Sequence, residues 1–591
     1  MPSPQSWSTS SASQSPPSHL HRTRFPDVPS IPPPLEEPRI YPGRGTPLNP
    51  FVVDWHLNDP EDPYNWSNLR RWFITVQLAS TTFAVSFGSS AYSGGLRGVT
   101  RDLHVSDEAA ILGISLYVLG FALGPLIFAP LSEMFGRRIV FLVTLSLHAI
   151  FQLQGAVCNN LATLLTCRLL TGVFGSSPLT NAGAVVSDIW NFRERGLASA
   201  IYSTVPFLGP VLGPVVGGFV AENPRLGWHF NFWLMFILAG IALVLGFFIT
   251  PETYAPVLLR WRAQKLHKMS VGTIYYTTSY DHNQSKSFLQ IMRKNLSRPF
   301  VFVVTEPIVL LFAIYISIMY GTLYALFSAF PIVFQQHKGF SPGQSGLAFL
   351  GIGLGIGLGT ASQSFQNRIY WRQMEKSETG RAPPEARLHV AMMGSVLAPV
   401  GLWWFAWTST PNVHWIVPIL AGVPFGAGVA QILQSLTTYL MDTYNVYFAS
   451  ATAATVVVRS FCGAAFPLFS PAMFDALGDQ WAMSVFAILS TVCIPIPIFF
   501  LKYGWWIRSK SVVAYKDTDS EPQPISATVI ATRAVEIETF QLDTVPEKET
   551  ETPTDETAGF TQSPYHRPSV EKEETSMEIP MRHSLVPRDK E

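Results

Sequence analysis

The chain has 591 residues, of which 48% are hydrophobic and only 14% are charged, and its formal net charge is zero. Soluble proteins usually carry about 25% charged residues, so this composition excludes an ordinary water-soluble enzyme and favours an integral membrane protein. The balanced charge indicates no nucleic acid partner, and the four cysteines lack the spacing of a disulfide framework or a zinc site.

The amino-terminal segment is rich in proline and serine. Residues 1–50 contain 13 prolines and no periodic apolar pattern, so this stretch cannot bury enough surface to fold alone. We therefore predict a disordered tail over residues 1–70. It has no apolar core preceded by basic residues, as a signal peptide would, so we expect this end of the chain in the cytosol.

Twelve apolar segments of about 20 residues follow, and each is long enough to cross the ~30 Å hydrocarbon core of a bilayer as a helix. They form one bundle of six within residues 71–250 and another within residues 303–506, and a polar linker, 251–302, separates the two. The predicted spans are 73–93, 109–130, 139–157, 162–186, 197–219, 230–250, 303–326, 345–365, 389–407, 414–440, 447–473 and 482–503.

Basic residues are distributed unevenly between the predicted loops. With the amino terminus in the cytosol, the loops on the cytosolic side hold 17 Lys or Arg residues and the outer loops hold four. Cytosolic loops retain basic residues, so this bias predicts that the linker and both termini are cytosolic. Residues 511–591 hold 17 acidic and eight basic residues, and we predict a disordered acidic tail over residues 507–591.

The two bundles repeat several spacings, which favours two related six-helix units in an all-α integral membrane fold. One set of positions recurs at an offset of 231 residues and another at an offset of 254. The repeated positions are Gly120, Gly124 and Arg137 with Gly351, Gly355 and Arg368, and Gly172, Asp188 and Gly209 with Gly426, Asp442 and Gly463.

Three motifs resemble those of the major facilitator superfamily. The stretch GPLIFAPLSEMFGRR at 124–138 is similar to the loop between the second and third helices of that family. CRLLTG at 167–172 is similar to its arginine motif in the fourth helix, and GPVLGPVVGG at 209–218 is similar to its antiporter motif in the fifth. The resemblance implies the major facilitator fold, in which two bundles of six helices enclose a substrate path.

Shorter stretches resemble one branch of the superfamily, the fungal twelve-spanner drug:proton antiporters of the cycloheximide- and multidrug-resistance type. These stretches are DPEDPYNW at 59–66, PETYAP at 251–256 and PEARLHVAMMG at 384–394. The branch implies a monomer without cofactors or metal ions, placed in the plasma membrane or, as an alternative, in the vacuolar membrane.

The first motif implies a gate at the cytosolic face. By the resemblance, Glu133, Arg137 and Arg138 form a charge relay between the flanking Gly124 and Gly136 and hold this face in one of two states. Glu133 stands where the family more often has Asp, and its longer side chain carries the carboxylate further from the backbone. The alternative is that the arginines only follow the excess of positive charge on the cytosolic side.

The third motif lets the fifth span bend and lets another helix approach to backbone distance. In the resemblance it marks exporters, and the alternative is simple close packing. The motif residues are Gly209, Pro210, Gly213, Pro214, Gly217 and Gly218.

Three charged residues inside the spans are candidates for proton coupling. Arg168 and Arg459 lie within apolar spans, where a charged side chain is costly and needs a functional or structural reason. For Arg168 the alternative is a side chain that extends to the outer interface. Glu306 lies about one turn into the seventh span and could carry a proton, and the alternative is that it anchors the end of that helix.

By analogy with the family, helices 1, 4, 7 and 10 line the substrate cavity. The candidate lining residues are Tyr320, Tyr324, Phe327, Gln431 and Gln434. Aromatic and amide side chains suit a bulky, mostly apolar ligand with a few hydrogen-bonding groups.

The sequence thus predicts a proton-coupled efflux transporter that works by alternating access and is not an enzyme. The expected substrates are toxic small molecules, either foreign drugs and fungicides or a secondary metabolite made by the cell. The chain contains no Gly-Lys pair and so no phosphate-binding loop, which excludes ATP drive through that motif. The alternative is a proton symporter or facilitator that imports a nutrient.

Overall fold

The computed structural model describes residues 41–511, apart from 57, 192–193, 271, 281–287, 378–381 and 445–447. This part of the chain is mostly helical and includes a two-stranded parallel sheet. Most of the two tails that we expect to be disordered, residues 1–40 and 512–591, lies outside the described residues.

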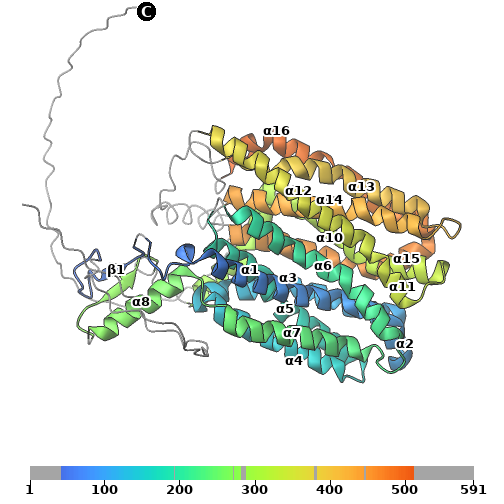
Figure 1. Ribbon diagram of the computed structural model, residues 1–591, viewed down its shortest axis with the longest axis horizontal. Helices are drawn as coiled ribbons and strands as arrows, with labels where there is room; N and C mark the ends of the chain where they lie inside the picture. The colour runs from blue at the N-terminus through green and yellow to red at the C-terminus, as the bar shows by residue number, and fades with distance from the viewer. Residues whose placement is uncertain are drawn as a thin grey trace, which may run out of the picture. The chain divides into compact units, whose positions relative to one another are not determined.

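Six long helices make up the first half of the described chain (Figure 1). A 3₁₀ turn, η2 (Ala91–Gly95), and the short helix α2 (Leu96–Leu103) connect the first two of them. The long helices are α1 (Asn68–Ser90), α3 (Asp107–Phe135), α4 (Arg137–Ala156), α5 (Leu161–Ile189), α6 (Arg195–Glu222) and α7 (His229–Ile249).

The second half repeats this arrangement of long helices, but short helices and turns interrupt it more often. Its long α15 (Phe448–Val492) turns at Gly478, whose backbone has a φ of 74° and is not helical. The other elements are α10 (Pro307–Phe330), the π-helical η3 (Pro331–His337), α11 (Pro342–Leu347), α12 (Phe349–Lys376), η4 (Pro384–Leu388), α13 (His389–Thr408), α14 (Ile416–Tyr444) and α16 (Pro495–Lys510).

Local sequence determines where several helices begin and end. The side chains of Ser106 and Asn160 accept backbone hydrogen bonds at the starts of α3 and α5, as helix-capping residues do. Gly136 separates α3 from α4 with a φ of 101°, a backbone conformation that glycine adopts without a side-chain clash.

Nine segments of the described chain are long and apolar enough to cross a membrane. The last of them, Ser450–Lys510, has 61 residues and contains the turn at Gly478, so it has the length for two crossings. The 23-residue α1 and the 29-residue α5 are also long enough but carry more buried polar side chains. With these, the helices agree with the twelve predicted spans.

Helix pairs repeat between the two halves. In the first half α3 packs on α5 and α1 on α6, and in the second α12 packs on α14 and α10 on α15. A Cβ atom at Gly120 or Gly124 would lie 2.4 Å from a backbone atom of α5, and one at Gly351 or Gly355 would lie 2.2 or 2.1 Å from α14. The repeated glycines therefore serve the same close contacts in both halves.

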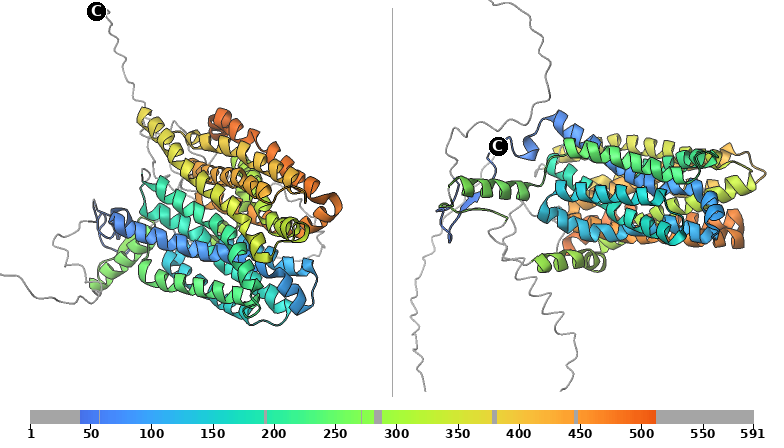
Figure 2. Two further views of the ribbon diagram at one scale, coloured as in Figure 1. Left: turned by 45° about the vertical axis from the view of Figure 1, so that its right-hand side comes forward. Right: turned by 90° about the horizontal axis from the view of Figure 1, so that it is seen from below.

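The halves meet mainly through three pairs of helices. The helix α3 packs on α15, and α6 packs on α11 and α12. In Figure 2 the helices of the first half, blue to green, run alongside those of the second half, yellow to orange. Any movement of one half against the other takes place at these contacts.

A small sheet lies beyond one end of the helices (Figure 1). The strand β1 (Phe51–Val53) pairs in parallel with β2 (Tyr276–Thr278), and α8 (Ala255–Met269) packs against both strands. We call the end of the bundle near α8 the linker end and the end near α2 the far end. Apolar residues before α1 pack on the linker, so the predicted tail, 1–70, includes an ordered part.

An ion pair fixes this contact between the segment before α1 and the linker. Arg262 of α8 lies 2.7 Å from the buried Asp59 carboxylate and also pairs with Glu61. Burial alone would lower the pKa of Arg262, but the hydrogen bonds to Asp59 and Glu61 raise that pKa above its usual value. The guanidinium also lies over the ring of Trp55.

The linker also includes a second helix, α9 (Phe288–Thr305), which begins after the sheet.

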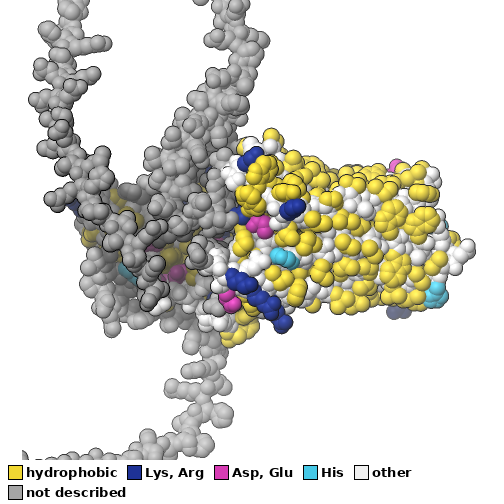
Figure 3. All heavy atoms as spheres, turned by 90° about the horizontal axis from the view of Figure 1, so that it is seen from above, with side chains coloured by type: hydrophobic (Ala, Val, Ile, Leu, Met, Phe, Trp, Pro, Cys, Tyr) yellow, Lys and Arg dark blue, Asp and Glu magenta, His cyan; other side chains and the backbone are white. Residues whose placement is uncertain are grey.

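The outer surface of the helices is apolar, as a lipid-facing surface requires. Figure 3 shows hydrophobic side chains over the helices on one face, and Lys and Arg side chains gathered toward the linker end. Exposed side chains on this surface include Phe248, Val304 and Leu354.

Candidate functional site

Arg168 is fully buried between α1, α3 and α5. Its Nη1 donates a hydrogen bond of 2.7 Å to the carbonyl of Gly88, and its Nη2 donates one of 3.0 Å to that of Ser89. Its Nε donates to the carbonyl of Gly113 at 3.0 Å, and the guanidinium lies 4.2 Å from the ring centre of Tyr117. These bonds hold the side chain inside the bundle. They do not agree with the alternative in which the Arg168 side chain extends to the outer interface.

A chain of hydroxyl groups continues from this arginine into the second half. Ser89 Oγ lies 2.9 Å from the Tyr324 hydroxyl, and the Tyr320 hydroxyl donates to that of Tyr324 at 3.3 Å. The guanidinium of Arg459 lies 5.0 Å from the centre of the Tyr320 ring. We call these five residues, Arg168, Ser89, Tyr324, Tyr320 and Arg459, the central network. The structure thus brings together four candidate residues that are far apart in the sequence.

The two arginines of the central network are bound differently. Arg168 donates three hydrogen bonds to backbone carbonyls. Arg459 is only partly buried as a residue, but its Nε is buried and has no hydrogen-bond partner in the described part of the chain. In the described part of the chain, Arg459 therefore has fewer hydrogen-bond acceptors than Arg168.

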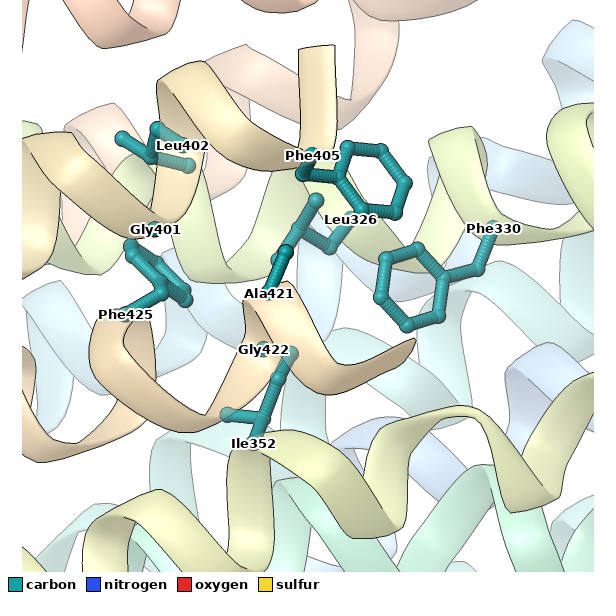
Figure 4. A pocket seen from close by; sticks show the side chains of 9 residues that line it. All are labelled: Leu326, Phe330, Ile352, Gly401, Leu402, Phe405, Ala421, Gly422 and Phe425. Carbon is teal, nitrogen blue, oxygen red and sulfur yellow. The ribbon is translucent and has the colours of Figure 1, made fainter. Parts of the chain in front are cut away.

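Phe327 extends the aromatic side of the network toward the interior of the second half. Its ring packs edge-on against Tyr324, with the ring centres 5.2 Å apart, and also contacts Phe349. Nearby, α10, α12, α13 and α14 surround a small pocket with about 200 Å³ of empty space (Figure 4). Its lining is entirely apolar: Leu326, Phe330, Ile352, Gly401, Leu402, Phe405, Ala421, Gly422 and Phe425.

The two candidate glutamines belong to a different polar contact. Gln434 Nε2 donates to Thr204 Oγ1 of α6 at 2.8 Å and to Thr360 Oγ1 of α12 at 3.3 Å, so this contact also crosses between the halves. Gln431 Nε2 donates to Ser362 Oγ at 2.9 Å. A polar pocket of about 290 Å³ lies beside them and is lined by Gly196, Ser199, Gln363, Asn367, Arg387, Gln434 and Thr438.

Glu306 lies at the linker end, in the position before the first residue of α10. Its carboxylate is buried and accepts hydrogen bonds from the Tyr444 hydroxyl at 2.9 Å and from Ser511 Oγ at 2.9 and 3.0 Å. Tyr320 is fourteen residues further along α10, which is ~21 Å at 1.5 Å per residue. The geometry favours the anchoring alternative for Glu306, and its role in proton transfer stays a prediction.

At the linker end of the first half, Arg137 is paired with Asp188 rather than with Glu133. Its Nε lies 3.4 Å from Asp188 Oδ2, and its Nη1 donates to Ser132 Oγ at 2.7 Å. Glu133 forms no ion pair within 4 Å in the described part of the chain, although its charge is near that of Arg137. The ion pair of Arg137 is thus with Asp188, and the charge relay of Glu133, Arg137 and Arg138 stays a prediction.

A second carboxylate, Glu252, binds the start of α4. It accepts hydrogen bonds from the backbone amides of Arg137 at 3.0 Å and Arg138 at 3.1 Å, where a helix start leaves amides unsatisfied. A Cβ atom at Gly136 would lie 2.3 Å from a Glu252 carboxylate oxygen, so a side chain there would displace Glu252 and would also be strained by the φ of 101°. Arg138 donates from its side chain to the carbonyl of Phe247 at 3.0 Å.

The second half has a corresponding ion pair that the sequence comparison did not identify. Arg387 Nε lies 2.8 Å from Asp442 Oδ2, and its guanidinium lies 3.5 Å from the ring centre of Tyr370. Arg368, which the repeat spacing aligned with Arg137, is exposed instead. The sequence did contain a signal for this ion pair, because Asp188 and Asp442 occupy equivalent positions in the repeat.

The antiporter motif brings α6 to backbone distance from α1 and from the η2 turn that follows it. Cβ atoms at Gly209, Gly213 and Gly217 would lie 2.6, 2.7 and 2.1 Å from backbone atoms of Phe87 and Ala91. The next glycine, Gly218, faces the other half, where a Cβ would lie 2.6 Å from the carbonyl oxygen of Pro342. The motif's two prolines, Pro210 and Pro214, lie inside α6.

Comparison with known proteins agrees with this architecture. Residues 78–467 match the model of the Major Facilitator Superfamily. The chain belongs to this superfamily. It is 46% identical over 471 residues to the "MFS-type efflux pump MFS2" of Trichophyton rubrum, a match that covers 80% of this chain and 78% of the relative.

Two further similarities come from another fungal protein and from a solved structure. The chain is 45% identical over 477 residues to the "multidrug transporter mdrA" of Aspergillus fumigatus, covering 80% and 78% of the two chains. The structure of the proton:xylose symporter XylE matches with a TM-score of 0.56 at 14% identity, covering 74% of this chain and 96% of that one. Family and fold indicate a multi-pass membrane transporter rather than an enzyme.

Proposed function

We propose that this transporter exports bulky, mostly apolar toxic molecules from the cytosol in exchange for protons. The observation that carries the direction of transport is the 44 to 46% identity, over about four fifths of the chain, to fungal proteins named efflux pumps and a multidrug transporter. The substrate is either a foreign drug or fungicide or a toxin that the cell makes itself.

Alternating access follows from the way in which the halves are built. The Arg137–Asp188 pair lies within the first half and the Arg387–Asp442 pair within the second, so each pair braces one half without joining it to the other. The contacts between halves are α6 with α11 and α12, and α3 with α15. Rocking about these contacts would open the central network first to one end and then to the other.

Protons supply the driving force in this proposal. A membrane potential contributes ~2.3 kcal/mol per charge per 100 mV, which corresponds to about a fiftyfold concentration ratio. Arg168, Arg459 and Glu306 remain the candidates for coupling. Arg168 and Arg459 are supported by their place in the central network, and Glu306 by the burial of its carboxylate.

The proposed orientation places the linker end and both termini in the cytosol. The excess of basic residues in the loops of that side supports it. We further propose a monomer in the plasma membrane, without a nucleic acid partner, with bundles at 71–250 and 303–506 and tails at 1–70 and 507–591. The segment 41–66 is then an ordered part of the first tail.

The test is accumulation of labelled toxins in transporter-deficient fungal cells that express the chain, with and without a protonophore. We expect the chain to lower accumulation and the protonophore to abolish this effect. The Glu306→Gln variant, at matched surface expression, tests whether Glu306 is the proton-coupling site. This question is separate from whether the protein exports toxins. If export survives this substitution, Glu306 is an anchoring residue, whereas accumulation that rises with an inward proton gradient would establish an importer instead.

A further inference from the structure

Arg459 carries a positive charge that no ion pair neutralises within the described part of the chain. Its buried Nε has no hydrogen-bond acceptor, and the contact found for its guanidinium in the described part of the chain is the face of the Tyr320 ring. A charged donor that is buried without an acceptor is costly, and proteins avoid it unless a ligand or partner completes the bond.

The spans contain no acidic residue that could fill this role. Glu306 is the one Asp or Glu within the twelve predicted spans, and it is bound to Tyr444 at the linker end. The other arginine of the central network, Arg168, donates to carbonyl oxygens, which carry no net charge. The centre of the bundle therefore has two guanidinium groups and an excess of positive charge.

Arg459 faces the contact between the halves rather than the lipid. Tyr320 of α10 lies against its guanidinium, and Tyr202 of α6, in the first half, is near enough to interact with its charge. One turn further along α15, a Cβ at Gly463 would lie 3.1 Å from Val118 of α3. Arg459 is only partly buried as a residue, so the surrounding helices do not enclose it completely.

We infer that Arg459 binds an acidic group of the transported molecule, so that the substrates include organic anions with a bulky apolar body and a carboxylate or similar oxyanion. A guanidinium can bind a carboxylate through two parallel hydrogen bonds, which gives both affinity and orientation. The neighbouring tyrosines, Tyr320 and Tyr324, then offer ring faces and hydroxyl groups to the rest of the molecule. This inference rests on the proposed export function and narrows its substrate class.

The experiment compares acids with their uncharged amides on the purified full-length protein. The probes are 2-naphthoate, indole-3-acetate and 4-butylbenzoate, each paired with its primary carboxamide, and dissociation constants are measured by calorimetry. We expect at least one acid to bind ~10-fold or more tightly than its amide, as a charge-assisted hydrogen bond predicts. Arg459→Gln should remove this preference and leave amide binding within about twofold.

Controls separate the charge of Arg459 from a general effect. Arg225→Gln, in an exposed loop, should keep the preference. Arg459→Lys should keep only part of it, since an ammonium cannot form the paired bonds, and this variant serves if Arg459→Gln does not fold. The inference is overturned if no acid exceeds its amide in the wild type, or if the preference persists without the guanidinium.

The transport assay distinguishes the two proposals. If neutral toxins are exported in a protonophore-sensitive way but no acid is preferred in binding, the export function stands and the anion site is wrong. If acids bind through Arg459 but no compound is exported, the binding site stands and the export function fails.

Discussion

At the scale of single residues, the chain places its buried and partly buried arginines in different settings. Arg168 is held by three backbone carbonyls, Arg137 and Arg387 by carboxylates, and Arg459 by an aromatic ring. Because an arginine in a membrane helix is costly, each needs a partner, and the kind of partner indicates its task. Carbonyls fix a position, carboxylates brace a helix end, and a ring face leaves hydrogen-bond donors for a ligand.

The Arg387–Asp442 pair leads to a prediction with a control inside the same half. Arg387→Gln removes one partner from a buried ion pair, and we expect the loss of about 3–5 kcal/mol of stability and of transport, because Asp442 is left buried without a counter-charge. Arg368→Gln, at the position that sequence spacing alone would choose, should change neither, since Arg368 is exposed.

The measurement for this pair is the thermal unfolding midpoint of purified protein, together with export in cells. Equal effects of Arg387→Gln and Arg368→Gln would contradict the assignment of Arg387 as the counterpart of Arg137. The reciprocal variant Asp442→Asn should reproduce the Arg387→Gln result, because it breaks the same pair.

At the scale of elements, glycines decide how closely helices approach. The motif in α6 has glycines at 209, 213 and 217, four residues apart, so they lie on one face of the helix and meet α1. The same principle joins α3 to α5 and α12 to α14. Without such positions, side chains would hold the backbones several ångströms further apart.

We predict that Gly213→Ala strongly reduces export and folded protein, because the new Cβ would lie 2.0 Å from Ser90 Oγ and 2.7 Å from the backbone amide of Ala91. The matched control is Gly240→Ala in α7, where nothing lies within 4 Å of the added Cβ. Since alanine favours a helix over glycine by up to ~1 kcal/mol, that control should be neutral or slightly stabilising. Fluorescence-detected size exclusion would report both, and equal loss in both variants would refute the close-contact explanation.

At the scale of the whole molecule, few hydrogen bonds between side chains join the halves in the described part of the chain. Besides the bond of Ser89 with Tyr324, Thr204 Oγ1 of α6 lies 2.8 Å from Thr360 Oγ1 of α12 and also receives a hydrogen bond from Gln434. If the halves rock, these contacts must break and form again in each cycle. The ion pairs at the linker end lie within single halves and can persist throughout.

This arrangement predicts that a covalent link between the halves stops transport. The double variant Thr204→Cys/Thr360→Cys places two sulfur atoms where the hydroxyl oxygens are 2.8 Å apart, and mild oxidation should cross-link it. We expect export to fall to background on oxidation and to return with a reducing agent. Each single variant, treated in the same way, is the control. Full export by protein that is demonstrably cross-linked would rule out rocking about this contact.

The sequence predicted the membrane fold well because its signals are strong and local. A stretch of about 20 apolar residues forms a spanning helix wherever it occurs, since no backbone polar group can remain unsatisfied in lipid. The motifs at 124–138 and 209–218 likewise identified the family that the comparisons establish. The order within the segment before α1 could not be predicted in this way, because Asp59 is bound by Arg262, some 200 residues away.

The sequence by itself thus determined the spans, the repeat, the family and the candidate residue types, all of which depend on composition and short-range spacing. Only the tertiary structure decided which residues meet: that Arg168 and Arg459 share one network, that Asp188 rather than Glu133 binds Arg137, and that Glu306 lies at a helix end. Such pairings join residues on helices that lie far apart in the chain. They depend on how each helix is rotated about its axis by packing, and hydropathy does not encode that rotation.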